Sequence, residues 1–109
     1  MVVVKEYEQE DGKHPFSIWF DSLNVQAALK IRTAIARMEA GNFSNVEPVG
    51  QGVKEYKVNF GPGYRIYFGN DGDKLVILLG GGTKKRQSRD VNTAQILWKE
   101  YKSRKRRGN

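Results

Sequence analysis

The chain of 109 residues contains no cysteine, only three prolines, one histidine and no long apolar run. Without cysteine it has neither a disulfide framework nor a thiolate metal site. Its longest apolar run, Leu75 to Leu79, is far shorter than the roughly 20 residues that span a bilayer. The N-terminal MVVVKEYEQEDG lacks the basic start and apolar core of a secretory signal. We therefore expect a cytoplasmic protein with no membrane segment.

Charge is abundant but unevenly distributed. The net charge is +7, and the chain from Lys99 onward contributes six cations against one acid, Glu100, a balance of +5. A second basic cluster, Lys84-Lys85-Arg86 with Arg89, lies further inside the chain. Clustered cations are typical of proteins that bind nucleic acid or an acidic partner. A terminal basic run is just as often a solvated end, so we expect one domain over 1–104 and a basic tail over 105–109.

The stretch from Glu55 to Phe68 has the period-2 pattern of a β-hairpin, with Gly61-Pro62-Gly63 at its turn. If Phe60 faces Tyr64, then Val58 pairs with Ile66 on an apolar face. The same register gives the opposite face two cations and two hydrogen-bonding side chains, namely Lys57, Asn59, Arg65 and Tyr67. An ordinary interpretation is a sheet with one solvated face.

The rest of the pattern predicts an α+β fold in the order strand, helix, helix, three strands, helix (β-α-α-β-β-β-α). A strand over 2–7 precedes a short helix that starts at Pro15, and a longer helix over 25–40 is capped by Asp21, Ser22 or Asn24. The segment 42–52 reads as a connection. A strand over 74–79 ends at three glycines, and a last helix capped by Ser88 or Asp90 runs to about 104. We expect a mostly antiparallel sheet with the two-helix hairpin packed on one face.

Chain direction brings several polar residues together. In an antiparallel meander, the end of the third strand lies beside the start of the second, near Arg65. One cationic site is therefore predicted from Lys57, Asn59, Arg65, Lys84, Arg86, Gln87, Arg89 and Asp90. Cleavage of RNA by its own 2′-hydroxyl needs a base, cations around the phosphate and an acid for the leaving oxygen. Tyr67 is a candidate to stack on an unpaired base.

Three segments, FSIWFDSL, GNFSNVEPVGQGVKEYKVNFGPGYRIYF and LLGGGTKKRQSRDVNTA, resemble the RelE/ParE toxin superfamily, in particular its HigB-like branch of addiction-module killer proteins. The resemblance covers roughly residues 10 to 101 and implies a RelE-like fold of helices on an antiparallel sheet. It also implies a toxin that a neighbouring antitoxin, a small helix-turn-helix protein, neutralises. Most relatives cut messenger RNA on the ribosome, without a metal or other cofactor, whereas the ParE branch poisons DNA gyrase.

Carried over by position, the resemblance implies catalytic roles for Lys57, Arg65, Lys84 and Asp90. The RNA contacts predicted from the cationic cluster itself are Asn59, Tyr67, Lys85, Arg86, Gln87 and Arg89. This chain departs from the pattern at three places: Asn59 stands where RelE has a second lysine, no tyrosine follows the last strand, and the C-terminal histidine of some HigB toxins is missing.

Three hypotheses follow from the sequence. The first is a ribosome-dependent mRNA endoribonuclease, in which the basic tail also holds ribosomal RNA. The second is a non-catalytic gyrase inhibitor of the ParE type, which the missing histidine and tyrosine favour. The third is a basic domain without toxicity.

Overall fold

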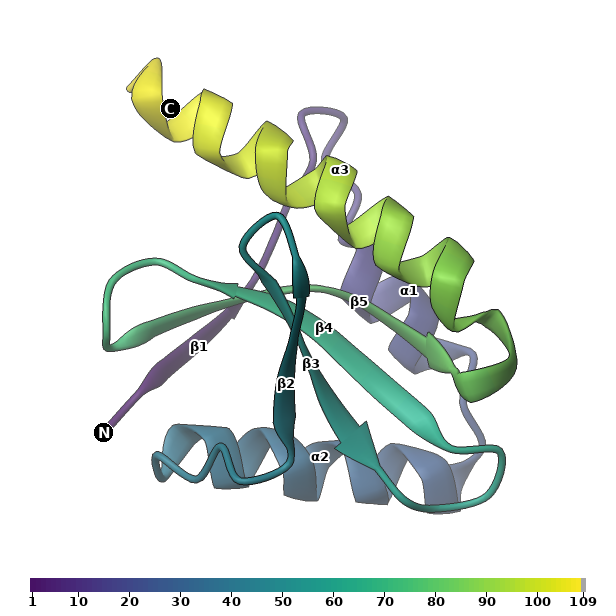
Figure 1. The fold of residues 1–109 in the computed structure, drawn as a ribbon. Coiled ribbons are helices and arrows are strands. Elements are labelled where there is room, and N and C mark those ends of the chain that lie inside the picture. Colours follow the sequence, from purple (N-terminus) through teal and green to yellow (C-terminus); the bar gives the residue numbers. More distant parts are fainter. Residues whose placement is uncertain (109) are drawn as a thin grey trace.

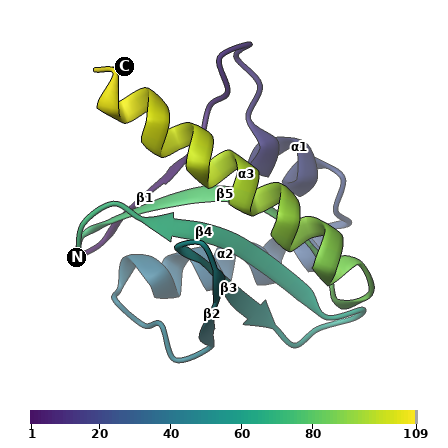
Figure 2. The same cartoon turned by 45° about the horizontal axis from the view of Figure 1, so that its top comes forward.

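A computed structural model describes residues 1–108 as a five-stranded sheet with helices on both faces (Figures 1 and 2). The α+β class, the mostly antiparallel sheet and the helical hairpin are confirmed. The elements in chain order are β1 (Val3–Glu6), α1 (Pro15–Asp21), α2 (Val25–Glu39), β2 (Val46–Gly50), β3 (Val53–Val58), β4 (Tyr64–Asn70), β5 (Leu75–Thr83), the 3₁₀ turn η1 (Lys84–Arg86) and α3 (Gln87–Arg106).

The strands lie in the order β1-β5-β4-β3-β2, and only the β1–β5 pair is parallel. Strand β2 corrects our prediction, because the segment 42–52 was expected to be a connection without a strand. Pro48 and two glycines argue against a strand, but an edge position tolerates a proline, whose missing N–H removes no inner ladder bond. In the part of the chain that the structure describes, no helix is long and apolar enough to cross a bilayer.

The central hairpin forms with a register two residues from the expected one. Val58 pairs with Tyr64 and Lys57 with Arg65, so the turn spans 59–63 instead of 61–63. A shift by two keeps every side chain on its face, because side chains alternate with a period of two. The predicted division of residues between the two faces therefore survives the error in register.

The first face carries the larger core. Helix α2 begins at its N-cap Asn24, which is one of the three predicted caps. The Asn24 side chain accepts a hydrogen bond from the Ala27 N–H at 2.9 Å. The stripe that α2 buries is Ala27, Ile31, Ala34 and Met38. It packs with Phe16 of α1 on the apolar side chains of β3, β4 and β5.

The second face is not solvated, which contradicts the ordinary interpretation of the hairpin. Helix α3 lies across it, as Figure 2 shows, and buries a second core that includes Val53, Ile77, Leu79, Leu97 and Trp98. The apolar stripe of α3 was recognised in the sequence, but nothing there showed which face it would cover.

Strand β5 is longer than predicted, because its three glycines lie inside the strand and do not end it. The β4–β5 register shifts between Tyr67 and Phe68, which is the bulge that this glycine run accommodates. Trp19 of α1 packs directly against Gly81, where a Cβ atom would collide with the indole ring. The glycines thus allow α1 to cover the half of β5 that the short strand β1 leaves unpaired.

Candidate functional site

The site predicted from the sequence lies where β3, β4 and the end of β5 meet η1 and the start of α3. Lys57 and Arg65 are direct cross-strand partners, and Arg65 also pairs with Gly82 of β5. The expectation that the end of the third meander strand lies beside Arg65 is therefore confirmed by the strand register.

One carbonyl joins the side chain of Arg65 to the backbone of Lys84. Gly63 O accepts Arg65 Nη1 at 3.1 Å and the Lys84 N–H at 2.8 Å. Gly63 has a φ of +79°, a left-handed conformation that favours glycine, and a Cβ atom there would lie 3.2 Å from Arg65 Nη1 and 3.5 Å from Lys84 Cβ. This turn holds the guanidinium against the backbone from which Lys84 projects.

Arg65 is itself largely buried, at 8% exposure. Its Nε lies 3.9 Å from Oε1 of Glu55 and has no hydrogen-bond partner among the described residues. The guanidinium thus belongs to a buried ion pair, and it shares the Gly63 carbonyl with the backbone N–H of Lys84. A buried, held guanidinium is preorganised to stabilise an anion, since it loses little conformational freedom on binding.

Glu55 was not among the predicted site residues. It is 1% exposed, and both of its carboxylate oxygens accept hydrogen bonds from Gln87 Nε2, at 2.8 and 3.2 Å. Gln87 is the first residue of α3, so this contact fixes the start of the helix to β3. The available signal was its position: Glu55 lies two residues before Lys57, so both side chains are on the same face of the strand, next to the strand of Arg65.

Asp90 lies in the first turn of α3 and is not the helix cap, because α3 starts three residues earlier with Arg86 as its N-cap. Its carboxylate rests against Gly82, where a Cβ atom would collide with it. Burial raises the pKa of Asp90 above its ordinary value, and the nearby charges of Arg86 and Arg89 oppose that rise. A carboxyl group with a raised pKa is better suited to move a proton than an ordinary aspartate.

Tyr67 is 1% exposed, so its ring is not available to stack on an unpaired base. The prediction of base stacking at this residue is wrong for the structure described, because α3 covers the face that the sequence suggested was open. Its hydroxyl has no hydrogen-bond partner among the described residues. Burial, with smaller effects of Glu55 and Asp90, raises the pKa of Tyr67. Tyr67 and Asp90 both line a small pocket of about 120 Å³ between α1 and α3.

The remaining predicted residues lie closer to solvent. Lys57 is half-buried and forms an ion pair with Glu47 of β2, with Nζ 3.1 Å from Oε2. The exposed members are Asn59 in the hairpin turn and Lys84, Lys85, Arg86 and Arg89 around the start of α3. The site therefore combines a buried Glu55–Arg65–Gln87 network with a rim of exposed cations.

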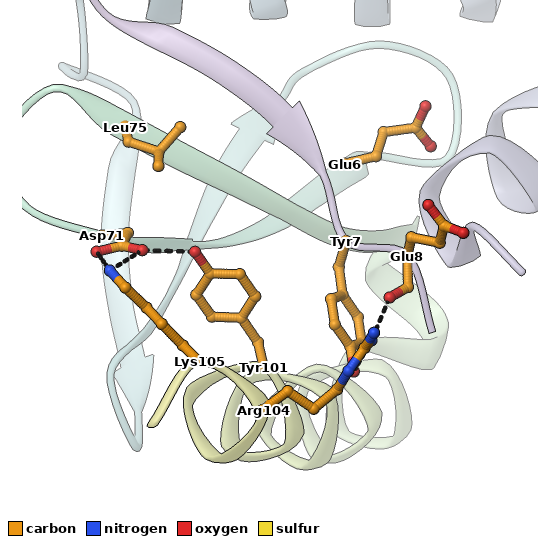
Figure 3. A pocket seen from close by; sticks show the side chains of 8 residues that line it. All are labelled: Glu6, Tyr7, Glu8, Asp71, Leu75, Tyr101, Arg104 and Lys105. Atoms are coloured by element: carbon orange, nitrogen blue, oxygen red, sulfur yellow. Dashed lines mark hydrogen bonds and ion pairs between the residues drawn. The ribbon is translucent and has the colours of Figure 1, made fainter. Parts of the chain in front are cut away.

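A larger pocket of about 400 Å³ lies near the C-terminal end of α3, away from all these residues (Figure 3). There Asp71 accepts hydrogen bonds from Tyr101 and Lys105, and Arg104 donates to Glu8 O. The hydrogen bonds of Tyr101 and Lys105 lower the pKa of Asp71, while burial and Asp71 raise the pKa of Tyr101 to about 12. These contacts anchor the last turns of α3, including part of the predicted basic tail, since the helix continues to Arg106.

No cluster of three or more histidine, aspartate or glutamate side chains within residues 1–108 is arranged to hold a metal ion. What the cationic site offers to a ligand is charge and hydrogen-bond donors. Such a set suits a phosphate group.

Comparison with known proteins identifies relatives of this chain. Residues 18–102 match the model of a family described as "Phage derived protein Gp49-like (DUF891)". A protein of Haemophilus influenzae described as uncharacterized is 40% identical over 86 residues, which are 78% of this chain and 87% of that protein. The matched region contains α2, the whole β2–β5 meander and most of α3.

Proposed function

The chain belongs to the phage-derived Gp49-like family, a toxin–antitoxin-type family related to RelE and HigB, and from that premise we propose that it is the toxin of a type II module that cleaves messenger RNA on the ribosome. The finer assignment to the HigB-like branch is part of this proposal. The protein would act in the cytoplasm, where messenger RNA and ribosomal RNA are its nucleic-acid partners.

The observation that carries the proposal is the shared carbonyl of Gly63, which holds the Arg65 guanidinium beside the backbone of Lys84. In-line attack by a 2′-hydroxyl builds negative charge on the phosphate, and fixed cations stabilise this charge without reorganising. Arg65 would bind the scissile phosphate from a rigid position, and Lys84 would bind it from the rim.

The proton transfers need two further groups. Lys57 would help to activate the 2′-hydroxyl as a cation that stabilises its developing negative charge, once the substrate displaces Glu47 from the ammonium group. Asp90, with its raised pKa, would take up the proton that leaves the 2′-hydroxyl and relay it to the leaving 5′-oxygen. Around them Asn59, Lys85, Arg86 and Arg89 would bind the RNA strand. Gln87 would support this binding indirectly, because its contact with Glu55 orders the start of α3.

The test compares cleavage of ribosome-bound messenger RNA by purified wild-type protein and by Arg65→Lys. Lysine keeps the charge but lacks the planar fork of donors, so we expect cleavage to fall on the order of 100-fold. Lys84→Gln should also lower cleavage. Lys74→Gln, which removes an exposed cation beside the β4–β5 turn, serves as the control. Full cleavage by a folded Arg65→Lys variant would remove Arg65 from the site.

The ParE-type inhibition of DNA gyrase is the second candidate. One observation favours it: the only tyrosine that the predicted site includes is buried, and no histidine occurs between residues 84 and 109. A supercoiling assay with the same preparations separates the two functions. Inhibition of gyrase together with intact ribosome-bound message would decide for the gyrase-inhibitor alternative.

An antitoxin partner follows from the family, and we propose that it is a small helix-turn-helix protein encoded by an adjacent gene. Co-expression of that protein should restore growth of bacteria that produce this chain. Growth arrest that persists with the antitoxin present at equal levels would contradict the pairing.

A further inference from the structure

A groove of about 500 Å³ runs between the β2–β3 turn and the outer face of α3. Its charged lining residues are Lys99, Lys102 and Arg106, and its other lining residues are Gln51, Asn92, Gln95 and Ile96. No acidic side chain among residues 1–108 lines it. The groove lies on α3, and none of the predicted site residues lines it.

The groove is built by close packing of the turn against the helix. Gln95 Nε2 donates a hydrogen bond to Val49 O at 3.0 Å, and a Cβ atom on Gly52 would lie 2.8 Å from Nε1 of Trp98. Between them Gln51 has a φ of +59°, an uncommon conformation for a residue with a side chain. Such local strain persists only where the surroundings enforce it, so the backbone of the turn is held in place.

The cations at the C-terminal end of α3 fall into two sets. In the first set, Arg104 donates hydrogen bonds to the Tyr7 hydroxyl and to the backbone carbonyl of Glu8. Lys105 forms a salt bridge with Asp71, and Arg107 forms one with Glu10. The other set is Lys99, Lys102 and Arg106, which are exposed and form no salt bridge within residues 1–108. Lys102 Nζ lies 5.8 Å from the centre of the Trp98 ring, which carries no net charge.

We propose that this groove, defined by Gln51, Lys99, Lys102 and Arg106, binds the phosphate backbone of an RNA strand. Arg106 lies seven positions after Lys99, so the three cations occupy about 10 Å of helix length. Asn92 and Gln95 add uncharged donors of the kind that contact phosphate and sugar oxygens. Contacts of this kind give affinity and orientation without reading sequence.

RNA is favoured over an acidic protein as the occupant because three cations but only one large apolar side chain line the groove among the described residues. Ile96 is its only large apolar side chain, whereas protein interfaces are built around a buried apolar centre. The choice of RNA, as distinct from another phosphate polymer, rests on the proposed function. Helix α3 would then link two RNA contacts, since its 20 residues span about 30 Å, with the cationic site at its start and the cations of the groove in its last two turns.

The experiment measures binding of a fluorescent 2′-O-methyl RNA oligonucleotide at salt concentrations from 50 to 200 mM. Methylation removes the attacking hydroxyl, so binding is read without cleavage. The test variant is the triple substitution Lys99→Gln, Lys102→Gln and Arg106→Gln in the full chain. Its control is Lys5→Gln, Lys13→Gln and Lys74→Gln, which removes the same charge from exposed positions outside α3.

Each phosphate contact on a single strand contributes about 0.7 to the slope of log affinity against log salt. Loss of three contacts should lower that slope by about 2, so wild type loses about 20-fold more affinity than the test variant over this range. The control should keep a slope within about 1 of wild type. Thermal unfolding checks that both variants are folded.

Equal slopes for the two triple variants would overturn the proposal, because binding would then depend on diffuse charge alone. Polyglutamate that competes as well as RNA at equal charge would also overturn it and assign the groove to an acidic protein. The result is independent of catalysis: a groove that binds RNA in a protein without cleavage activity refutes the proposed nuclease and leaves the groove in place.

Discussion

The buried pair of Glu55 and Arg65 allows a quantitative test of how the candidate site is held together. Oε1 and Nε lie 3.9 Å apart, and the side chains are 2% and 10% exposed. At an effective dielectric constant near 20, two unit charges at that distance attract by about 4 kcal/mol. Desolvation offsets much of this attraction, but removal of one partner leaves the other charge buried without compensation.

We therefore expect Arg65→Ala and Glu55→Gln each to lower the free energy of unfolding by about 3 kcal/mol. The double variant should lose less than the sum of the two, with a coupling energy of about 1–3 kcal/mol. Urea unfolding at pH 7 measures all four proteins, because a single domain of this size is expected to unfold in two states.

The matched control is the ion pair of Lys57 and Glu47, which has a shorter distance of 3.1 Å but side chains that are 35% and 63% exposed. Its coupling energy should stay below about 1 kcal/mol, as for other exposed pairs. If the buried pair couples no more strongly than this one, the reasoning fails, and Arg65 is held by the Gly63 carbonyl alone. The outcome also decides which variants are useful for activity: an unstable Arg65→Ala cannot report on catalysis, whereas Arg65→Lys keeps the charge beside Glu55.

Three further predictions concern close packing and pH. Gly69→Ala places a Cβ atom 2.5 Å from the Trp98 ring, so it should destabilise the protein by about 1–3 kcal/mol, and this cost should nearly vanish in a Trp98→Leu background. Gly82→Ala should push the Asp90 carboxylate toward solvent and return its raised pKa toward the ordinary value; NMR titration of the carboxyl carbon checks this, and an unchanged pKa would contradict the contact. Asp71→Asn should lower the free energy of unfolding by an amount that does not change with pH around neutrality. Because the folded pKa of Asp71 is lowered, that difference should shrink only as the pH falls below about 3.9, and a difference that disappears already near pH 6 would refute it.

The sequence predicted those helix starts that are determined by residues close together in the chain. Pro15 opens α1 and Asn24 caps α2, because both effects depend on a few neighbouring residues. The two faces of the hairpin also followed from alternation. The register did not, because the hydrophobic pattern permits any shift by two and only the length of the turn decides between them.

The missed features all depend on tertiary contacts. Strand β2 exists because the edge of β3 offers it a partner, despite Pro48. The burial of Glu55 and Tyr67 depends on α3 crossing that face, which a period of two cannot distinguish from open solvent. Among the candidate site residues, the sequence therefore predicted which would be neighbours better than it predicted which would be exposed.

Helix α3 ties the stability of the fold to the arrangement of the candidate site. Its apolar side completes the second core, its first residue binds Glu55, and the cations of η1 precede it directly. A substitution that shifts α3 on the sheet therefore moves Lys84 relative to Arg65 even when both residues are intact. The Gly63 carbonyl opposes that shift, because it accepts hydrogen bonds from both the Arg65 guanidinium and the Lys84 N–H and so ties the backbone at the start of η1 to the buried guanidinium.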